Sequence, residues 1–203
     1  MKQVMVDLDD TLVSFSEMFC DRWNRYIRKQ APYFSGANYT ISLKDITEYD
    51  LFKSLNQFYQ NNGCKGTHSL SSYFEDCLKE IFSDETFYTN PYLTPEYYNI
   101  FRLLKTTFKD DKIILHTKAS TYEMMISKAN LFKKYSDFNI FDEIIVDIEK
   151  GMNHTPKPTH YDVMFDDAPH NIENFLNKNP NGLVYMPVRE FNKHLKNNRI
   201  IYL

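Results

Sequence analysis

Short apolar runs that alternate with helical patterns constrain the fold of this chain more than any other feature of its sequence. Five of these runs stand out, at residues 4–6, 113–115, 144–146, 163–165 and 183–185. An apolar run without polar alternation indicates a strand that is buried on both faces, as in a parallel sheet. Because helical patterns lie between most of the runs, we predict an α/β fold with a parallel sheet of about five strands and helices on both faces.

The stretch between the first and second runs is long and helical in pattern. After Phe15, apolar residues recur at spacings of three and four, which predicts an amphipathic helix that ends before Pro32. Little strand pattern follows before the second run. We therefore interpret residues 14–89 as a helical cap domain, inserted into a Rossmann-type core domain that comprises residues 1–13 and 90–203.

Boundary signals place the starts of three further helices. Ser72 and Glu75 have the spacing of a capping box, which predicts a helix that begins there. Thr94 followed by Pro95 predicts an N-cap and a first-turn proline. A second capping-box spacing begins at Ser120, directly after the second apolar run.

Composition and charge exclude several classes of protein. The 203 residues include 24 Lys and Arg against 27 Asp and Glu, without long blocks of one sign, which argues against a nucleic-acid polymer as partner. The 5 glycines fit neither G-x-G-x-x-G nor a P-loop, which excludes a glycine cradle for a nucleotide. No run is long enough to span a membrane and the charged start does not fit a signal peptide, so we expect a cytoplasmic protein. The 3 cysteines lack paired spacing and fit reduced, packed thiols.

Polar residues that follow the predicted strands are the candidates for chemistry, because ligands bind outside the carboxyl ends of parallel strands. These residues are Asp7 and Asp9 after the first run, His116, Thr117 and Lys118 after the second, and Asp166 and Asp167 after the fourth. Carboxylates gathered without a neighbouring arginine repel one another, and a hard divalent cation such as Mg²⁺ relieves that repulsion. The pattern predicts metal-assisted phosphate chemistry on a small-molecule substrate.

In the residues at the ends of these strands, the chain resembles the haloacid dehalogenase (HAD) phosphohydrolases. VMVDLDDTL at the start resembles their first motif, LHT at residues 115–117 their second, Lys157 the lysine of their third, and VMFDDAPHN at residues 163–171 their acidic fourth. The four motifs occur in the family's order over nearly the whole chain. Each motif alone is weak, and their joint placement is specific.

Within that superfamily the chain is more similar to the 5'(3')-deoxyribonucleotidases. Phe15 stands eight positions beyond the first aspartate, Asp162 precedes the acidic pair, and TFYTNPYL resembles the segment by which the chain leaves the cap. The sequence departs from the family pattern where Asp10 replaces a glycine and Lys118-Ala119 replaces Ser-Pro. It also lacks the basic residue just before the third-motif lysine. The last two departures bear on base preference and not on the reaction.

The resemblance implies a role for each motif residue. Asp7 would be the nucleophile that forms an aspartyl-phosphate, and Asp9 the general acid and then the general base. Thr117 would bind a phosphoryl oxygen and Lys157 would neutralise charge. Mg²⁺ would take Asp7, the Asp9 carbonyl and Asp167, which we favour over Asp166. The residues expected to bind the rest of the substrate are Phe15, Tyr49 and Lys118.

Structural roles compete with several of these assignments. Asp10 and Asp166 also fit turn formers or helix caps, and Lys150 competes with Lys157 for the third-motif position. His116 is expected only to line the pocket, and the aromatic candidates Phe15 and Tyr49 also fit a plain core. The other histidines lack ligand spacing and are expected to be solvated or capping; they are His68, His154, His160, His170 and His194.

Three functions remain in competition at this stage. The first is a Mg²⁺-dependent phosphomonoesterase acting on nucleoside monophosphates, with deoxyribonucleotides preferred. The second has the same chemistry on another small phosphorylated metabolite, such as a sugar phosphate. The third is a non-catalytic relative that binds a phosphorylated ligand or a protein. The sequence leaves open whether the protein is a monomer or a homodimer.

Overall fold

The computed structural model describes residues 1–30, 34–64, 68–149 and 155–203. Within these residues, six strands form one parallel sheet in the order β3-β2-β1-β4-β5-β6. The strands are β1 (Gln3–Val6), β2 (Lys112–Ala119), β3 (Glu143–Ile148), β4 (Val163–Phe165), β5 (Leu183–Met186) and β6 (Ile200–Tyr202). The predicted parallel α/β fold is confirmed, and the sixth strand is an addition to the five runs.

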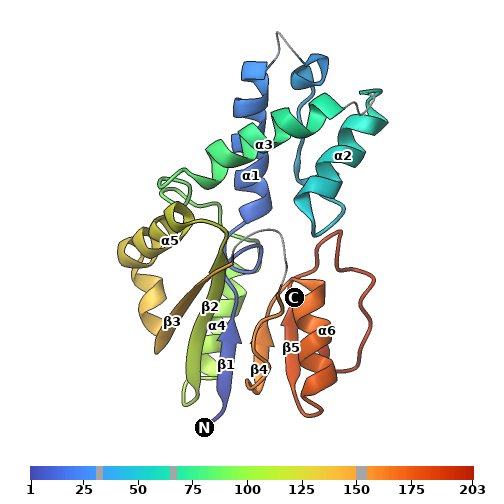
Figure 1. Ribbon diagram of the computed structural model, residues 1–203. Coiled ribbons are helices and arrows are strands. Elements are labelled where there is room, and N and C mark those ends of the chain that lie inside the picture. The colour runs from blue at the N-terminus through green and yellow to red at the C-terminus, as the bar shows by residue number, and fades with distance from the viewer. Residues whose placement is uncertain (31–33, 65–67, 150–154) are drawn as a thin grey trace.

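Helices cover both faces of this sheet (Figure 1). The α-helices are α1 (Phe15–Ile27), α2 (Leu51–Asn61), α3 (His68–Phe82), α4 (Tyr97–Thr106), α5 (Tyr122–Lys134) and α6 (Pro169–Lys178). Four 3-10 helices join them: η1 (Arg28–Gln30), η2 (Ser35–Asn38), η3 (Leu43–Asp45) and η4 (Ser136–Ile140). No helix in the described part of the chain is both long and apolar enough to cross a membrane.

Alternation along β1 assigns its side chains to two hydrophobic cores. Val4 and Val6 point to the face that α4 and α5 cover, whereas Met5 points to the face that α6 covers. All three residues are fully buried. Burial on both faces explains why the run lacks polar alternation.

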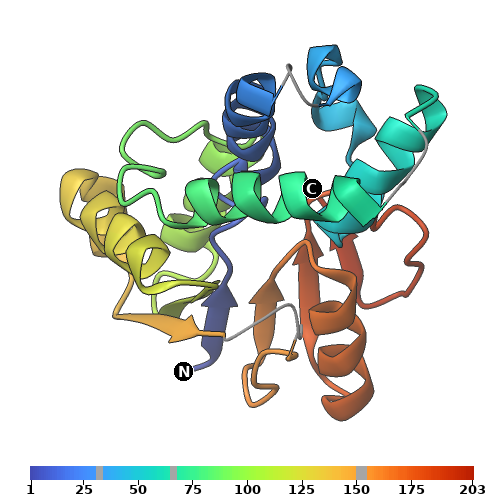
Figure 2. The same cartoon turned by 45° about the horizontal axis from the view of Figure 1, so that its top comes forward.

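The helices α1, α2 and α3 form a lobe above the carboxyl ends of the strands (Figure 1), and α3 runs across those ends (Figure 2). Aromatic side chains fill this helical lobe: Trp23 packs edge-on against Phe74 with ring centroids 5.1 Å apart and donates a hydrogen bond of 2.9 Å to the Tyr59 hydroxyl. The three cysteines are buried and free, as expected; they are Cys20, Cys64 and Cys77. The core of the lobe is continuous with the core on one face of the sheet, and the lobe lies over the sheet edge where ligands bind in such folds.

Two chain segments connect the helical lobe to the sheet, and they are paired with each other. Val13 and Leu93 form an antiparallel bridge, and the Ser14 amide donates to the Tyr92 carbonyl at 2.8 Å. The pairing places the segment around Tyr92 and Leu93 beside the loop that follows β1.

Three of the predicted helix starts are wrong. α3 begins at His68, so that Ser72 lies inside it. α4 begins at Tyr97, because the Thr94 hydroxyl donates instead to the Thr11 carbonyl at 2.8 Å. α5 is capped one residue later than expected, by the Thr121 side chain.

Candidate active site

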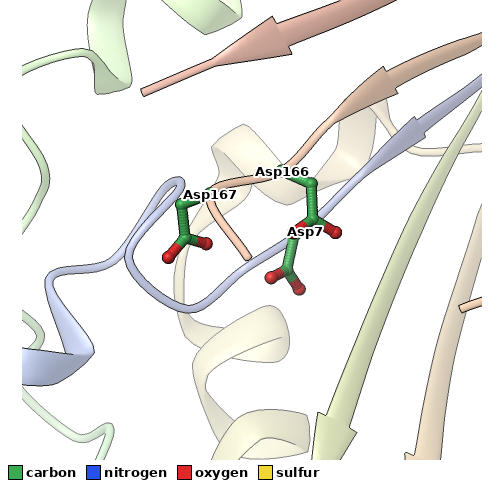
Figure 3. Close-up of side chains that lie close together, drawn as sticks. All are labelled: Asp7, Asp166 and Asp167. Atoms are coloured by element: carbon green, nitrogen blue, oxygen red, sulfur yellow. The ribbon is translucent and has the colours of Figure 1, made fainter. Parts of the chain in front are cut away.

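Three carboxylates meet where β1 and β4 end. Asp7 follows β1, and Asp166 and Asp167 follow β4, its neighbour in the sheet. All three are buried, and one oxygen atom of each lies within 4.8 Å of the others (Figure 3). The strand order reverses between β1 and β4: the chain adds β2 and β3 on one side of β1, and then β4, β5 and β6 on the other. Parallel sheets bind ligands at such a switch point.

Lys157 is the cation of this cluster. Its Nζ lies 2.5 Å from Asp7 Oδ1 and 3.0 Å from Asp166 Oδ2, and its amide donates to Asn171 Oδ1 at 3.0 Å. Burial alone would lower the pKa of Lys157, but the two carboxylates outweigh burial and raise it, so that the side chain is charged. The competing Lys150 lies outside the described residues.

Asp166 and Asp167 differ in what their oxygens contact. Asp166 binds Lys157 and also accepts from the Ala168 amide at 2.8 Å and from the Asn171 side chain at 3.1 Å. It therefore forms the turn into α6, which was the structural alternative for this residue. Asp167 accepts one hydrogen bond of 3.2 Å from the Thr11 hydroxyl. Burial and neighbouring carboxylates raise the pKa of Asp167 well above its usual range, which marks it as the carboxylate in need of a cation.

The cluster fits a divalent cation by its donor set and its charge. Among the described residues, five carboxylates gather here, from Asp7, Asp9, Asp10, Asp166 and Asp167. Three cations oppose them, Lys128, Lys157 and Arg189, so the expectation that no arginine lies beside the cluster is wrong, but negative charge remains in excess. Burial raises the pKa of Asp7 and of Asp9, and the nearby lysines only partly oppose it. Hard oxygen ligands with an excess of negative charge suit Mg²⁺.

Asp9 is held at both oxygens. The Tyr88 hydroxyl donates to Asp9 Oδ1 at 2.5 Å, and Lys128 Nζ lies 2.5 Å from Asp9 Oδ2. The same ammonium group donates to Thr117 Oγ1 at 2.7 Å. The structure thus links the predicted acid and the predicted phosphate-binding threonine through a lysine on α5.

Asp10 shapes the loop between β1 and α1. Its φ of 51° is left-handed, a conformation that favours glycine and that aspartate tolerates better than most residues. Its side chain accepts from the Ser16 amide at 2.9 Å and from the Ser16 hydroxyl at 2.5 Å. Arg189 donates to the Asp10 carbonyl at 2.7 Å and pairs with Glu96 at 2.9 Å. Asp10 therefore accepts from the first turn of α1, which is the structural alternative for this residue.

Replacing Asp10 by alanine should lower the free energy of unfolding by about 1–2 kcal/mol, because the first turn of α1 loses its acceptor and alanine tolerates a left-handed φ poorly. Asp10→Asn is the matched control, since the amide oxygen still accepts from Ser16. Urea unfolding of the two variants measures the difference. Equal losses in both would contradict the capping role.

A cavity of about 390 Å³ opens from the carboxylates towards the helical lobe. Asp7, Asp9, Asp167 and Lys157 lie at its polar end. Apolar side chains dominate the remaining wall; they are Phe15, Leu51, Phe52, Leu78, Phe82, Met124 and Phe191. Both the sheet and the lobe contribute to this wall, so the cavity lies between them.

The predicted substrate-binding residues all line this cavity. Phe15 packs against Phe87 with ring centroids 5.5 Å apart. Tyr49 packs against His170 at 4.9 Å and against Phe191 at 5.6 Å, which joins the lobe to the sheet domain. Lys118 is at the rim, where its ammonium group pairs with Glu149 at 3.2 Å.

Two histidine predictions need correction. His116 does not line the cavity. It is buried on the face of the sheet that α6 covers, where its ring contacts the Tyr161 hydroxyl at 2.9 Å and Asp147 at 2.7 Å. His170, expected to be solvated or capping, lines the cavity beside Tyr49. Of the other histidines, His160 and His194 are exposed, His154 lies outside the described residues, and the side chain of His68 is not described.

Sequence reasoning missed Tyr88, Lys128, Arg189 and Phe191. Lys128 carried a signal, because it stands on the buried stripe of α5 with Met124 and Leu131. A lysine at such a position is rarely buried without a partner. Arg189 and Phe191 belong to the loop after β5, far along the chain from Asp10 and Tyr49, which they contact, and no local pattern marks them.

Comparisons with known proteins bear on the fold. No protein-family model matches the sequence, and no curated protein matches it either. Among solved structures, a haloacid dehalogenase-like hydrolase from Streptococcus pneumoniae has a TM-score of 0.58 at 13% identity, with 93% of this chain and 85% of that chain covered. A β-phosphoglucomutase from Clostridium difficile has a TM-score of 0.52 at 15% identity, with coverage of 99% and 90%.

A third similar structure is that of a Bacillus subtilis protein assigned to the HAD hydrolases and bound to magnesium. Its TM-score is 0.51 at 13% identity, and 97% of this chain and 89% of that chain are covered. The chain therefore has an HAD-like fold. Identities this low establish the fold and not the reaction, which has to be argued from the site.

Proposed function

We propose that this protein is a phosphomonoesterase of the HAD type that hydrolyses nucleoside monophosphates through an aspartyl-phosphate. One observation carries the proposal: the buried Asp7 lies 2.5 Å from Lys157, beside two further carboxylates, at the end of a cavity with an aromatic wall. The preference for deoxyribonucleotides and for 5' or 3' phosphates rests on the sequence resemblance alone.

In this proposal the chain's residues divide the reaction into two displacements. A carboxylate oxygen of Asp7 attacks phosphorus, the bond from phosphorus to the ester oxygen breaks, and Asp9 gives its proton to that oxygen. Water then attacks the aspartyl-phosphate, Asp9 takes the proton, and phosphate leaves with Asp7 restored. Lys157 and Thr117 stabilise charge on the phosphoryl oxygens.

Asp7, the Asp9 carbonyl and Asp167 would hold the metal ion in this proposal. A bound Mg²⁺ supplies charge neutralisation at the phosphoryl group. Asp166 would hold Lys157 in place and would not bind the metal ion, because its oxygens already bind Lys157, Ala168 and Asn171.

The aromatic side chains of the cavity wall support a nucleotide as the substrate. A nucleotide has a flat base and a polar sugar, and the wall offers contacts for both, since polar side chains such as Ser120, Thr121 and Asn171 line it beside the apolar ones. Phe15 and Tyr49 stand on segments at two sides of the cavity, and a flat base stacks well on such rings. The helical lobe would act as a cap that covers the base and excludes water.

A sugar phosphate or another small phosphorylated metabolite is the second candidate. The similar β-phosphoglucomutase structure favours it, since that protein shares the fold. Phosphate release from a panel of 5' and 3' ribo- and deoxyribonucleotides and sugar phosphates, each with Mg²⁺, separates the two. Nucleotides should give the highest kcat/KM, and a sugar phosphate above every nucleotide would replace the first candidate by the second.

Replacing Phe15 or Tyr49 by alanine should reduce kcat/KM for nucleotides about five- to a hundredfold, because stacking on one ring contributes about 1–3 kcal/mol per base. A small aryl phosphate lacks the base and should lose far less. Tyr98→Ala is the control, since Tyr98 is 75% exposed and is absent from the cavity wall. Equal losses on both substrates would show that the rings support the site as a whole and do not bind the base.

A further inference from the structure

A lysine that the proposed reaction does not use is buried next to its acid. The side chain of Lys128 is 0% exposed and stands on the face of α5 that packs on the sheet. A buried ammonium group is strongly unfavourable unless it is paired and hydrogen-bonded. The groups that pair with Lys128 therefore indicate the role of this side chain.

Three acceptors surround the Lys128 ammonium group. They are Asp9 Oδ2 at 2.5 Å, Thr117 Oγ1 at 2.7 Å and the Lys118 carbonyl oxygen. An ammonium group has three N–H donors, so these bonds use all of them. Lys128 has no donor left for a phosphate, which distinguishes it from Lys157.

The bonds from Lys128 restrict how its two side-chain partners are oriented. Because Thr117 accepts from Lys128, the single hydrogen of its hydroxyl is left to donate elsewhere; Thr117 itself is fully buried and does not line the cavity. Asp9 receives Lys128 at one oxygen and the Tyr88 hydroxyl at the other, at 2.5 Å. Each carboxylate oxygen has two lone pairs, so both contacts leave positions for the proton that Asp9 transfers.

Tyr88 and Lys128 also contact each other and come from different parts of the chain. The Lys128 ammonium lies 5.4 Å from the centre of the Tyr88 ring. Tyr88 is fully buried on the segment that returns from the helical lobe, and its amide donates to Ser127 Oγ on α5 at 2.8 Å. The two residues contact each other and both hold the Asp9 carboxylate.

We propose that Lys128 and Tyr88 are positioning residues that hold the Asp9 carboxylate in place for protonation of the leaving oxygen. The inference rests on the proposed function, and it concerns the first displacement only. In that step the bond from phosphorus to the ester oxygen breaks, and the Asp9 proton moves to that oxygen. An alkyl ester, such as a nucleotide, needs this proton because its alkoxide is a poor leaving group. An aryl ester needs it far less.

The test compares the two kinds of ester in a single turnover, where release of the alcohol or the phenol reports the first step. Lys128→Met should slow release from a deoxyribonucleotide about a hundredfold and from an aryl phosphate less than about tenfold, within the range that general acids contribute. Tyr88→Phe should show the same selectivity with a smaller loss. Asp9→Asn should show it fully, and Asp9→Asn combined with Lys128→Met should be no slower on the nucleotide than Asp9→Asn alone.

Two variants serve as controls that lose comparable contacts elsewhere. Tyr97→Phe removes a hydroxyl that donates to Asp137 at 2.9 Å, and Lys112→Met removes an ion pair of 2.8 Å with Glu143. Neither residue lines the cavity, so both esters should react at the wild-type rate.

The proposal fails if Lys128→Met or Tyr88→Phe slows both esters equally, or if Lys128→Met slows the Asp9→Asn protein further. If Lys128→Met does not fold, Tyr88→Phe decides, since it removes only a hydroxyl; a wild-type ratio of the two rates in that variant overturns the proposal. A wild-type protein that cleaves neither ester overturns the proposed function, and this inference with it. A wild-type protein that cleaves both, with unselective variants, overturns the inference alone.

Discussion

Asp7→Asn is expected to lower kcat at least about a thousandfold, a loss of about 4 kcal/mol of transition-state stabilisation. The amide keeps the shape of the side chain but is not a nucleophile, so no aspartyl-phosphate forms. The fold should persist, because Lys157 retains its 3.0 Å contact with Asp166 when the Asp7 charge is removed. Steady-state phosphate release measures the effect.

Two further measurements on Asp7→Asn separate chemistry from folding. Its circular dichroism spectrum and its thermal midpoint should stay close to those of the wild type, and Mg²⁺-dependent binding of a nucleotide should persist. Residual activity within tenfold of wild type would contradict the covalent mechanism, since that is a loss of only about 1.4 kcal/mol.

Removal of the metal should abolish activity, and Mg²⁺ should restore it. Asp167→Ala should raise the Mg²⁺ concentration for half-maximal activity at least about tenfold, because Asp167 is a buried carboxylate that accepts, among the described residues, a single hydrogen bond of 3.2 Å from the Thr11 hydroxyl. Asp166→Ala should raise this concentration less. It should instead lower the free energy of unfolding by about 1–3 kcal/mol, because the Ala168 amide and Asn171 lose their acceptor.

Asp167→Asn is the matched control for this comparison, since it keeps an oxygen ligand but removes the charge. Its Mg²⁺ requirement should fall between those of the wild type and Asp167→Ala. If Asp166→Ala raises the requirement more than Asp167→Ala does, the assignment of the metal ligand is reversed.

The sequence predicted the sheet because apolar runs leave a local record, even in β3, an edge strand with no buried residue. Apolar runs marked five of the strands, and the residues that follow them were expected to meet at one edge; Asp7, Asp166 and Asp167 do so. The strand β6 was missed although Ile200, Ile201 and Tyr202 form an apolar run as long as the other five.

Helix starts were predicted less well, because tertiary contacts outcompeted local caps. Thr94 has the spacing of an N-cap, but its hydroxyl donates to the Thr11 carbonyl and so connects the two segments that lead to the helical lobe. At α1, the side chain that accepts from the first turn is that of Asp10, six residues before Ser16. A cap that reaches back across a loop has no fixed spacing in the sequence.

The surroundings of Asp9 show the limit of motif reasoning. The motif gave Asp9 its expected role, but its partners Tyr88 and Lys128 are 79 and 119 residues away along the chain. Only the position of Lys128 on an apolar helical stripe carried a local signal. The supporting residues of a site are set by packing in three dimensions, which a linear pattern does not record.

The proposed function requires that Asp7 takes a phosphoryl group from a nucleotide. The most direct measurement is rapid acid quenching of the wild-type protein during turnover of a deoxyribonucleotide labelled in its phosphate, followed by mass spectrometry of the peptides. We expect a transient phosphoryl group on Asp7, and none on the Asp7→Asn protein. Release of labelled phosphate with no label on Asp7, or with the label on another side chain, would contradict this expectation.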